Sequence, residues 1–151
     1  MPDTTADVSE LIGSNPAQVW EALTDPEKIR QYYLGADVET DWKVGSPITW
    51  RGEWEGKTYS DKGEILDFQP SRHLSYSHWS PMSGTDDAAE NYHQVDIDLT
   101  EVDGGTRVRL RQSNLVGEVT EGDRKSRPEV EKNWQSMLQG LRKVVEGGDD
   151  H

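Results

Sequence analysis

Three ionisable side chains fall in segments whose residues alternate as they do in β-strands. They are Asp61, His78 and His93. Because successive side chains of a strand point to opposite faces, the alternation predicts that all three face the interior, among aromatic residues. A histidine paired with a carboxylate in an apolar cavity has the chemistry of a general base. The sequence therefore offers His78, His93 and Asp61 as candidate catalytic residues.

The same residues also have a purely structural interpretation. Each of the three side chains could lie near a strand end and bond to solvent or backbone. Alternatively, the true strand register differs by one residue, which would turn the side chains to the other face. The chain has no His-Glu-x-x-His, phosphate loop, dinucleotide fingerprint or Gly-x-Ser-x-Gly elbow. Asp96 and Asp98 are predicted on the outer sheet face beside two arginines, and His73 and His151 are predicted to be exposed. We expect neither a metal nor a cofactor.

The segment predicted to position these residues is the last long one, Pro128 to Glu146. Its apolar residues recur at spacings of three and four, as in an amphipathic helix: Val130, Trp134, Met137, Leu138, Leu141, Val144 and Val145. Ser126 and Glu129 fit a capping box, and Gly147-Gly148 fits a stop. The connection 116–127 is predicted to lack a stable core face. A helix with such an apolar face needs a sheet as its partner.

The preceding residues predict one strand, two short helices and then a run of antiparallel strands. Asn15 and Pro16 begin the first helix, and Pro26 begins the second, which ends near Tyr32. Strands are expected at 5–12, 37–41, 47–54, 57–68, 73–79, 92–102 and 106–112, with turn residues between them. The connection 80–90 is predicted to be a mobile loop. The expected class is α+β, with an antiparallel sheet of six to seven strands around the C-terminal helix.

Turn chemistry predicts the register of two hairpins. A two-residue turn at Asp103-Gly104 brings apolar residues together on one face, whereas a three-residue turn would oppose Leu99 to Arg109. The expected pairs are Leu99 with Val108, Ile97 with Leu110, Val95 with Gln112 and, across Glu55-Gly56, Ile48 with Gly63, Trp50 with Asp61, Gly52 with Tyr59 and Trp54 with Lys57. These registers determine which side chains face the interior.

Composition limits the classes of function. A chain of 151 residues without a change in composition predicts a single domain, 1–151, with its core at about 5–147. The chain has no cysteine, and its net charge of -13 repels phosphate backbones and anionic lipids. We therefore expect no nucleic-acid partner and no membrane. No signal segment and no apolar run of ~18 residues is present, so a soluble, cytoplasmic protein is expected.

Four stretches, in chain order, carry a family resemblance: residues 15–29, 63–74, 105–110, and 133–141 with its Asn-Trp and Met-Leu pairs. Together they resemble the domain family named after the activator of Hsp90 ATPase (AHSA1-like), a branch of the START-like, SRPBCC or Bet v 1-like superfamily. The resemblance covers nearly the whole chain. It implies the helix-grip fold, in which a curved antiparallel sheet surrounds a long C-terminal helix and often leaves a cavity beside it.

Such a cavity would suit a small apolar or aromatic molecule. The predicted ligand-binding residues are Trp50, Tyr59, Tyr76, His78, His93, Ile97, Leu110, Gln112, Trp134, Met137, Leu138 and Leu141, with Tyr32 and Tyr33 at the mouth. The same aromatic rings also have a structural interpretation, because large rings dominate core burial.

Three functions remain open. We favour ligand binding without catalysis. The alternative is an enzyme related to polyketide cyclases, aromatases or hydrolases of the superfamily, with His78 or His93 as the acid or base. The third, implied by the resemblance alone, is co-regulation of an Hsp90-type chaperone; the eukaryotic activator has a separate N-terminal domain, whereas this chain begins at the first predicted strand. Pairing of edge strands would allow a homodimer. The sequence does not identify the ligand.

Overall fold

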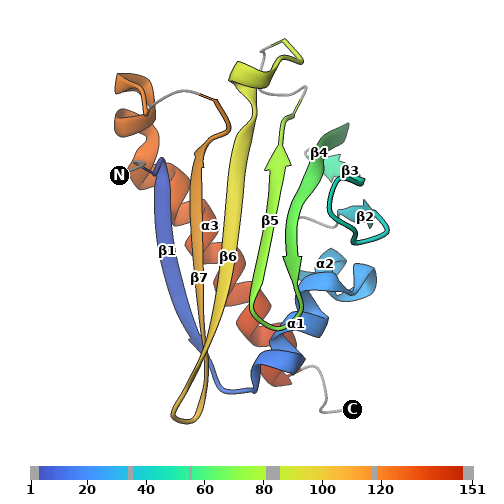
Figure 1. The fold of residues 1–151 in the computed structure, drawn as a ribbon, viewed down its shortest axis with the longest axis vertical. Coiled ribbons are helices and arrows are strands. Elements are labelled where there is room, and N and C mark those ends of the chain that lie inside the picture. The colour runs from blue at the N-terminus through green and yellow to red at the C-terminus, as the bar shows by residue number, and fades with distance from the viewer. Residues whose placement is uncertain (1–3, 34–35, 55, 81–85, 117–118, 148–151) are drawn as a thin grey trace.

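The computed structural model describes residues 4–33, 36–54, 56–80, 86–116 and 119–147. Their elements are β1 (Ala6–Ile12), α1 (Pro16–Thr24), α2 (Pro26–Tyr32), β2 (Asp37–Glu39), β3 (Pro47–Trp54), β4 (Lys57–Gln69), β5 (His73–His78), the 3₁₀ turn η2 (Ala89–Asn91), β6 (His93–Val102), β7 (Gly105–Asn114) and α3 (Glu121–Gly147). The strands form one antiparallel sheet in the order β1-β7-β6-β5-β4-β3-β2. The helix α3 crosses one face of this curved sheet (Figure 1). The predicted α+β class is confirmed.

Both predicted hairpin registers are confirmed. Ile97 lies opposite Leu110, and Trp50 lies opposite Asp61. Gly104 has a φ of 82° and Gly56 a φ of 79°, a left-handed backbone that glycine adopts without strain. Glu55 itself lies outside the described residues. Turn residues and apolar alternation were therefore sufficient to align these strands.

The strand β4 contains an irregularity that the alternation did not predict. The register between β4 and β5 shifts by one residue between Ile65 and Asp67. A shift of this kind bends a strand and increases its twist, which helps the sheet to curve around α3. Nearby, a Cβ on Gly63 would lie 1.7 Å from the carbonyl oxygen of Ser77, so only glycine fits where these strands approach so closely.

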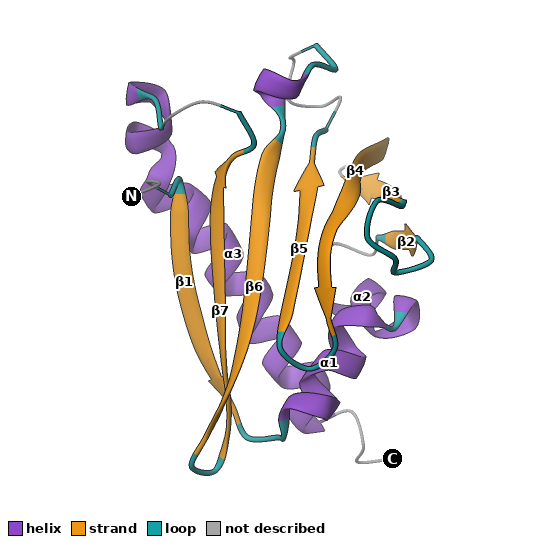
Figure 2. Ribbon diagram, viewed as in Figure 1, coloured by secondary structure: helices purple, strands orange, loops and turns teal. Residues whose placement is uncertain are grey.

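The two short helices begin where the sequence predicts. The side chain of Asn15 accepts a hydrogen bond from the Gln18 amide at 2.9 Å, and Asp25 accepts one from the Glu27 amide at 3.0 Å. Proline follows each cap, where its missing N–H removes no helical hydrogen bond. Both helices lie at the same end of the sheet (Figure 2).

The predicted start of the long helix is wrong. It begins at Glu121 rather than near Ser126, and Pro128 lies inside it. Thr120 and Asp123 cap this earlier start reciprocally, because each side chain accepts a hydrogen bond from the other's amide, at 3.0 Å and 2.8 Å. The predicted stop at Gly147-Gly148 is only partly described: the helix ends at Gly147, and Gly148 lies outside the described residues.

Side chains of α3 bond to the free edge of β1 and to Gly13, the residue that follows it. Glu131 accepts from the Asp7 amide at 3.0 Å, and Glu146 accepts from the Gly13 amide at 2.7 Å. Gln135 donates to the backbone oxygen of Ser9 at 3.1 Å. An edge strand normally presents unpaired backbone groups, and here the helix satisfies several of them. These bonds hold α3 against the first strand.

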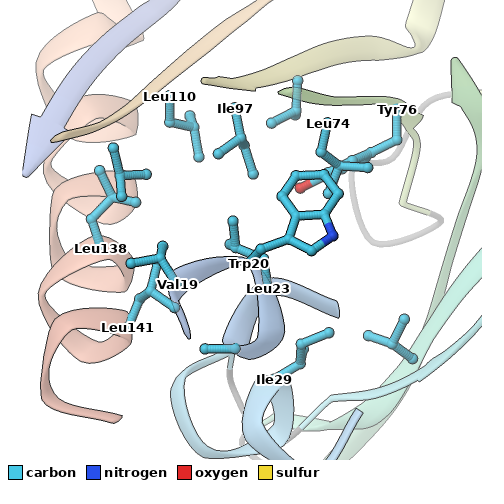
Figure 3. Packing of buried hydrophobic residues seen from close by; sticks show 14 of the residues in the cluster. Val19, Trp20, Leu23, Ile29, Leu74, Tyr76, Ile97, Leu110, Leu138 and Leu141 are labelled. Atoms are coloured by element: carbon cyan, nitrogen blue, oxygen red, sulfur yellow. The ribbon is translucent and has the colours of Figure 1, made fainter. Parts of the chain in front are cut away.

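The closely packed core lies at the end of the sheet nearest α1. Figure 3 shows Val19 of α1 beside Leu138 and Leu141 of α3, with Leu110 of β7 above them. All four of these side chains are fully buried. The helix α1 thus fills the space between sheet and α3 at this end.

Among the described residues, no helix is both long and apolar enough to cross a membrane.

Candidate functional site

A cavity of about 690 Å³ lies between the sheet and α3, away from the core around α1. Most of the described residues that line it belong to α2, β4, β5, β6, β7 and α3, whereas Tyr33 and Ser80 lie just outside these elements. The lining consists of Tyr32, Tyr33, Tyr59, Asp61, His78, Ser80, His93, Gln112, Val130, Asn133, Trp134, Ser136 and Met137. Ligand sites in proteins commonly have volumes of roughly 300–1,000 Å³. The cavity is therefore large enough for a small organic molecule.

Three neighbouring strands bring the candidate catalytic residues together. His78 lies directly opposite His93 across β5 and β6, and the Nε2 atom of His78 is 2.9 Å from Oδ2 of Asp61 on β4. Asp61 is only 9% exposed, and its Oδ1 atom is buried without a hydrogen-bond partner among the described residues. Because an ionised carboxylate only accepts hydrogen bonds, this contact favours the tautomer with the proton on Nε2. The Nδ1 atom of His78 is then an acceptor.

His93 lies in a less polar environment than an exposed histidine. Burial lowers the pKa of His93, and the nearby His78 lowers it further, whereas the carboxylate of Asp123 opposes them. Asp123 is itself hydrogen-bonded to Asn114, which pairs with His93 across β6 and β7. A lowered pKa keeps the His93 imidazole neutral at pH 7, so it can donate or accept a hydrogen bond without adding positive charge.

Aromatic rings form one wall of the site. Tyr33 stacks on Trp50 at a centroid distance of 6.5 Å and also meets Trp134 edge to face at 6.5 Å. Trp50 in turn contacts the His78 ring at 5.0 Å. Burial, and then the neighbouring Tyr76 and Asp61, raise the pKa of Tyr33, so its phenol stays neutral. The wall combines flat apolar surface with hydroxyl groups.

A hydrogen-bonded chain fixes the indole of Trp134 on α3. Its Nε1 donates to Oε1 of Gln112 at 2.8 Å, and Nε2 of Gln112 donates to Oγ1 of Thr5 at 2.9 Å. The chain links the helix, β7 and the residue preceding β1. It orients both amide ends of Gln112 and sets how far Trp134 projects over the cavity.

Gly52 makes room for Tyr59 on the adjacent strand. The two residues are paired across β3 and β4, and a Cβ on Gly52 would lie 2.7 Å from the Tyr59 hydroxyl. Any side chain at residue 52 would therefore displace the Tyr59 ring. Burial, followed by the charge of Asp61, raises the pKa of Tyr59.

The structure divides the predicted ligand-binding residues into three groups. Tyr59, His78, His93, Gln112, Trp134 and Met137 line the cavity. Trp50, Tyr76 and Ile97 line a neighbouring pocket of about 30 Å³, together with Met137. Leu110, Leu138 and Leu141 are fully buried in the core around α1 and are not among the lining residues.

Four residues that line the cavity were not among the predicted ligand-binding residues. They are Ser80, Val130, Asn133 and Ser136, of which the last three lie on α3. Val130, Asn133, Trp134 and Met137 are spaced by three, one and three residues, so they share one helical face. Helical spacing alone therefore indicates that Asn133 lies on the same face as Trp134, although its polar side chain does not belong to the apolar pattern.

The prediction that His73 is exposed is wrong. It is half-buried on the opposite sheet face, where its Nδ1 atom lies 2.7 Å from Oδ1 of Asp98 and its Nε2 atom 3.6 Å from Asp96. Arg111 forms an ion pair with the same Asp98 at 2.8 Å. His151 lies outside the described residues. Within the described ranges, no group of three or more His, Asp or Glu side chains is placed to hold a metal ion.

A curved antiparallel sheet around one long helix, with two short helices near the start of the chain, defines the helix-grip class of α+β proteins. Residues 14–146 match the family described as "Activator of Hsp90 ATPase homolog 1-like protein", and the chain belongs to this family. No curated protein matches the chain.

Three solved structures show what fold the chain is similar to. The protein ChR145 from Cytophaga hutchinsonii is 44% identical, with 97% of this chain and 96% of that chain covered and a TM-score of 0.77. The Aha1 dimer from Colwellia psychrerythraea is 18% identical, with 95% and 97% covered and a TM-score of 0.70. DynU16, from the dynemicin biosynthetic locus, is 18% identical, with 97% and 49% covered and a TM-score of 0.77. At this identity the last two share the fold alone.

Proposed function

We propose that the protein binds a small, largely apolar or aromatic molecule in the cavity between the curved sheet and α3. The observation that carries the proposal is the cavity itself, whose volume of about 690 Å³ is within the range of ligand sites.

The lining supports an aromatic or apolar ligand with a few polar groups. Tyr33, Trp134 and Met137 offer ring faces and a thioether, whereas His78 and Gln112 offer hydrogen bonds. Gln112 already bonds to Trp134, which leaves this part of the wall preorganised. A wall that is already ordered loses little conformational entropy when a ligand binds.

A cavity-filling variant tests the proposal. Val130 lines the cavity from α3, so Val130→Trp would occupy the ligand's space, whereas Glu129→Trp places the same ring at the adjacent exposed residue. Native mass spectrometry and thermal shift against lipids, polyketides and aromatic metabolites identify binders for the unmodified chain. Binders are expected to bind Glu129→Trp equally well and to lose affinity for Val130→Trp. Equal binding to both variants would place the ligand elsewhere, and a complete absence of binders would contradict the proposal.

Proton transfer is a second candidate function, and the 2.9 Å contact between His78 and Asp61 favours it. In this mechanism Nδ1 of His78 takes a proton from an acidic C–H or O–H group of the ligand. The electron pair of that bond stays on the ligand, and Asp61 stabilises the resulting imidazolium. His93, with its lowered pKa, would contribute a hydrogen bond or a second proton acceptor.

The histidines can be tested together once an activity is found. The doubly substituted His78→Gln and His93→Gln chain keeps hydrogen-bonding side chains but removes both imidazoles. Loss of turnover with retained ligand binding is the expected result for acid–base catalysis. Full turnover in this variant would eliminate the mechanism and leave the binding function intact.

Co-regulation of an Hsp90-type chaperone stays a prediction that rests on the family resemblance. The measurement is the ATPase rate of an Hsp90-type chaperone with and without an excess of this protein. An ATPase rate that increases with the concentration of this protein would support the role, and an unchanged ATPase rate would contradict it.

A further inference from the structure

We propose that the cavity selects organic cations: aromatic or alicyclic molecules that carry a protonated or quaternary amine. This inference rests on the proposed binding function and specifies the charge of its ligand. It follows from three features of the described lining: one buried carboxylate, several aromatic faces and the lack of a lysine or arginine among the lining residues.

The charges of the lining favour a cation. Asp61 is the one carboxylate among the described lining residues, and no lysine or arginine lies among them. The partner of its Oδ2 atom is His78, whereas its Oδ1 atom is buried without a hydrogen bond from any described residue. No lysine or arginine among the described lining residues therefore provides the Asp61 carboxylate with a permanent countercharge. An anionic ligand would meet this charge in a setting of low polarity, where repulsion is strong.

The aromatic residues supply a second attraction for a cation. Tyr33, Tyr59 and Trp134 line the same cavity as Asp61, and the Tyr33 ring contacts both Trp50 and Trp134. The faces of such rings carry partial negative charge and attract ammonium groups, most strongly when water is excluded. The same rings provide apolar surface for the body of the ligand. Carboxylate and rings thus favour the same ligand class.

The charge of the whole protein acts in the same direction. Its net charge is -13 at pH 7, which raises the local concentration of cations and lowers that of anions. This term is screened by salt, whereas the field of Asp61 inside the cavity is screened much less. Selectivity that persists at high salt therefore reports on the cavity rather than on the surface.

A matched set of three probes tests the inference: 1-naphthylmethylamine, 1-naphthylmethanol and 1-naphthoate, which share a ring system and differ in charge. Isothermal titration calorimetry is run at about pH 8, where ordinary histidines are neutral and the amine is protonated. We expect the amine to bind about tenfold more tightly than the alcohol and the acid about tenfold more weakly. We expect this order to persist in about 0.5 M NaCl.

The variant Asp61→Asn tests the role of the carboxylate, because it removes the charge and keeps the shape of the side chain. It is expected to bring the amine to the affinity of the alcohol, whereas Glu101→Gln, the same charge change at an exposed residue of β6, leaves the order unchanged. Circular dichroism checks the folding of both. If the alcohol binds the unmodified chain as tightly as the amine, the cation inference is overturned and the binding function stands. If none of the three probes binds, both fail.

Discussion

At the scale of single residues, Gln112 has the most connected position in the site. Its side chain accepts a hydrogen bond from Trp134 and donates one to Thr5, so one amide joins the helix, the sheet and the residue before β1. A leucine of similar size would leave the indole N–H and the threonine hydroxyl without these partners. The indole would lose its acceptor and the hydroxyl would lose its donor, and an unsatisfied polar group in a partly buried setting costs more than the bond itself contributes.

The substitution Gln112→Leu is therefore expected to lower the free energy of unfolding by about 1–2 kcal/mol. Urea unfolding followed by tryptophan fluorescence measures the change. Gln139→Leu, at an exposed residue of α3, is the control and is expected to change stability little. Equal stabilities of the two variants would mean that water replaces both contacts of Gln112.

The lowered pKa of His93 predicts how the stability of the fold depends on pH. Because its folded-state pKa lies below the value in the unfolded chain, the unfolded chain binds the proton more readily. Stability is therefore full above about pH 6.5 and falls as the pH drops toward the folded-state pKa. The neighbouring Asp123 has a lowered pKa, so its contribution is lost only below about pH 4.

The measurement is urea unfolding between about pH 7.5 and pH 5 for the unmodified chain and for His93→Gln. We expect the unmodified chain to lose more stability across this range than the variant does. His78 also lies in the cavity and is present in both proteins, so the difference reports on His93. Parallel curves for the two proteins would contradict a lowered pKa of His93.

The sequence predicted the inward-facing polar residues but not all of their partners. Strand alternation placed Asp61, His78 and His93 on one face because the period of two is strict once the turns fix the register. The 2.9 Å contact between His78 and Asp61 is a diagonal one that depends on the twist of the sheet, which no local pattern encodes. The bond between His73 and Asp98 was missed for a different reason: the two residues lie directly opposite each other across β5 and β6, and the register of this strand pair was not predicted.

At the scale of elements, α3 both closes the cavity and covers the edge of β1. Glu131 and Gln135 bond to the backbone of β1, and Glu146 accepts from the amide of Gly13, the residue after it. Arg127 donates to the backbone oxygen of Thr4 at 2.8 Å. These side chains occupy groups that another strand would otherwise pair with. A homodimer remains a prediction, and this edge is a poor candidate for its interface.

Removing the side chains that cover the edge is expected to promote self-association. In Glu131→Ala combined with Gln135→Ala, the Asp7 amide and the Ser9 oxygen lose their partners and become available to a second chain. Size-exclusion chromatography with light scattering is expected to show larger species that increase with concentration. The matched control is Lys132→Ala combined with Gln139→Ala, at exposed residues of the same helix. Identical elution of the two double variants would contradict the protective role of the helix.

The order and type of the helices and strands could be predicted from the sequence, whereas the first residue of α3 could not. Pro128 suggested a first turn because proline is common there, yet a helix can continue through proline when other contacts hold the preceding turn. Here the Thr120 and Asp123 cap and the Arg127 contact with Thr4 hold that turn. The capping pair is visible in the sequence, but Asp in place of the usual Glu made it less conspicuous.

At the scale of the whole molecule, α1 determines where the interior is hollow. Its side chain Val19 fills the space beside Leu138 and Leu141 (Figure 3), so the cavity is confined to the other half of the helix, around Trp134. The sequence predicted a lining along the full length of the sheet. It could not predict this division, because the position of a short helix against a curved sheet depends on the finished tertiary packing.

The central claim is that a small molecule binds between the sheet and the Trp134 half of α3. The most direct measurement is a two-dimensional NMR titration with 1-naphthylmethanol, a neutral probe that does not depend on ligand charge. We expect shifts of the Trp134 indole N–H and the amides of Asn133 and His93, with little change at Trp20 in the packed core. Saturable shifts confined to the outer sheet face, around Arg109, or no shift at all, would contradict the claim.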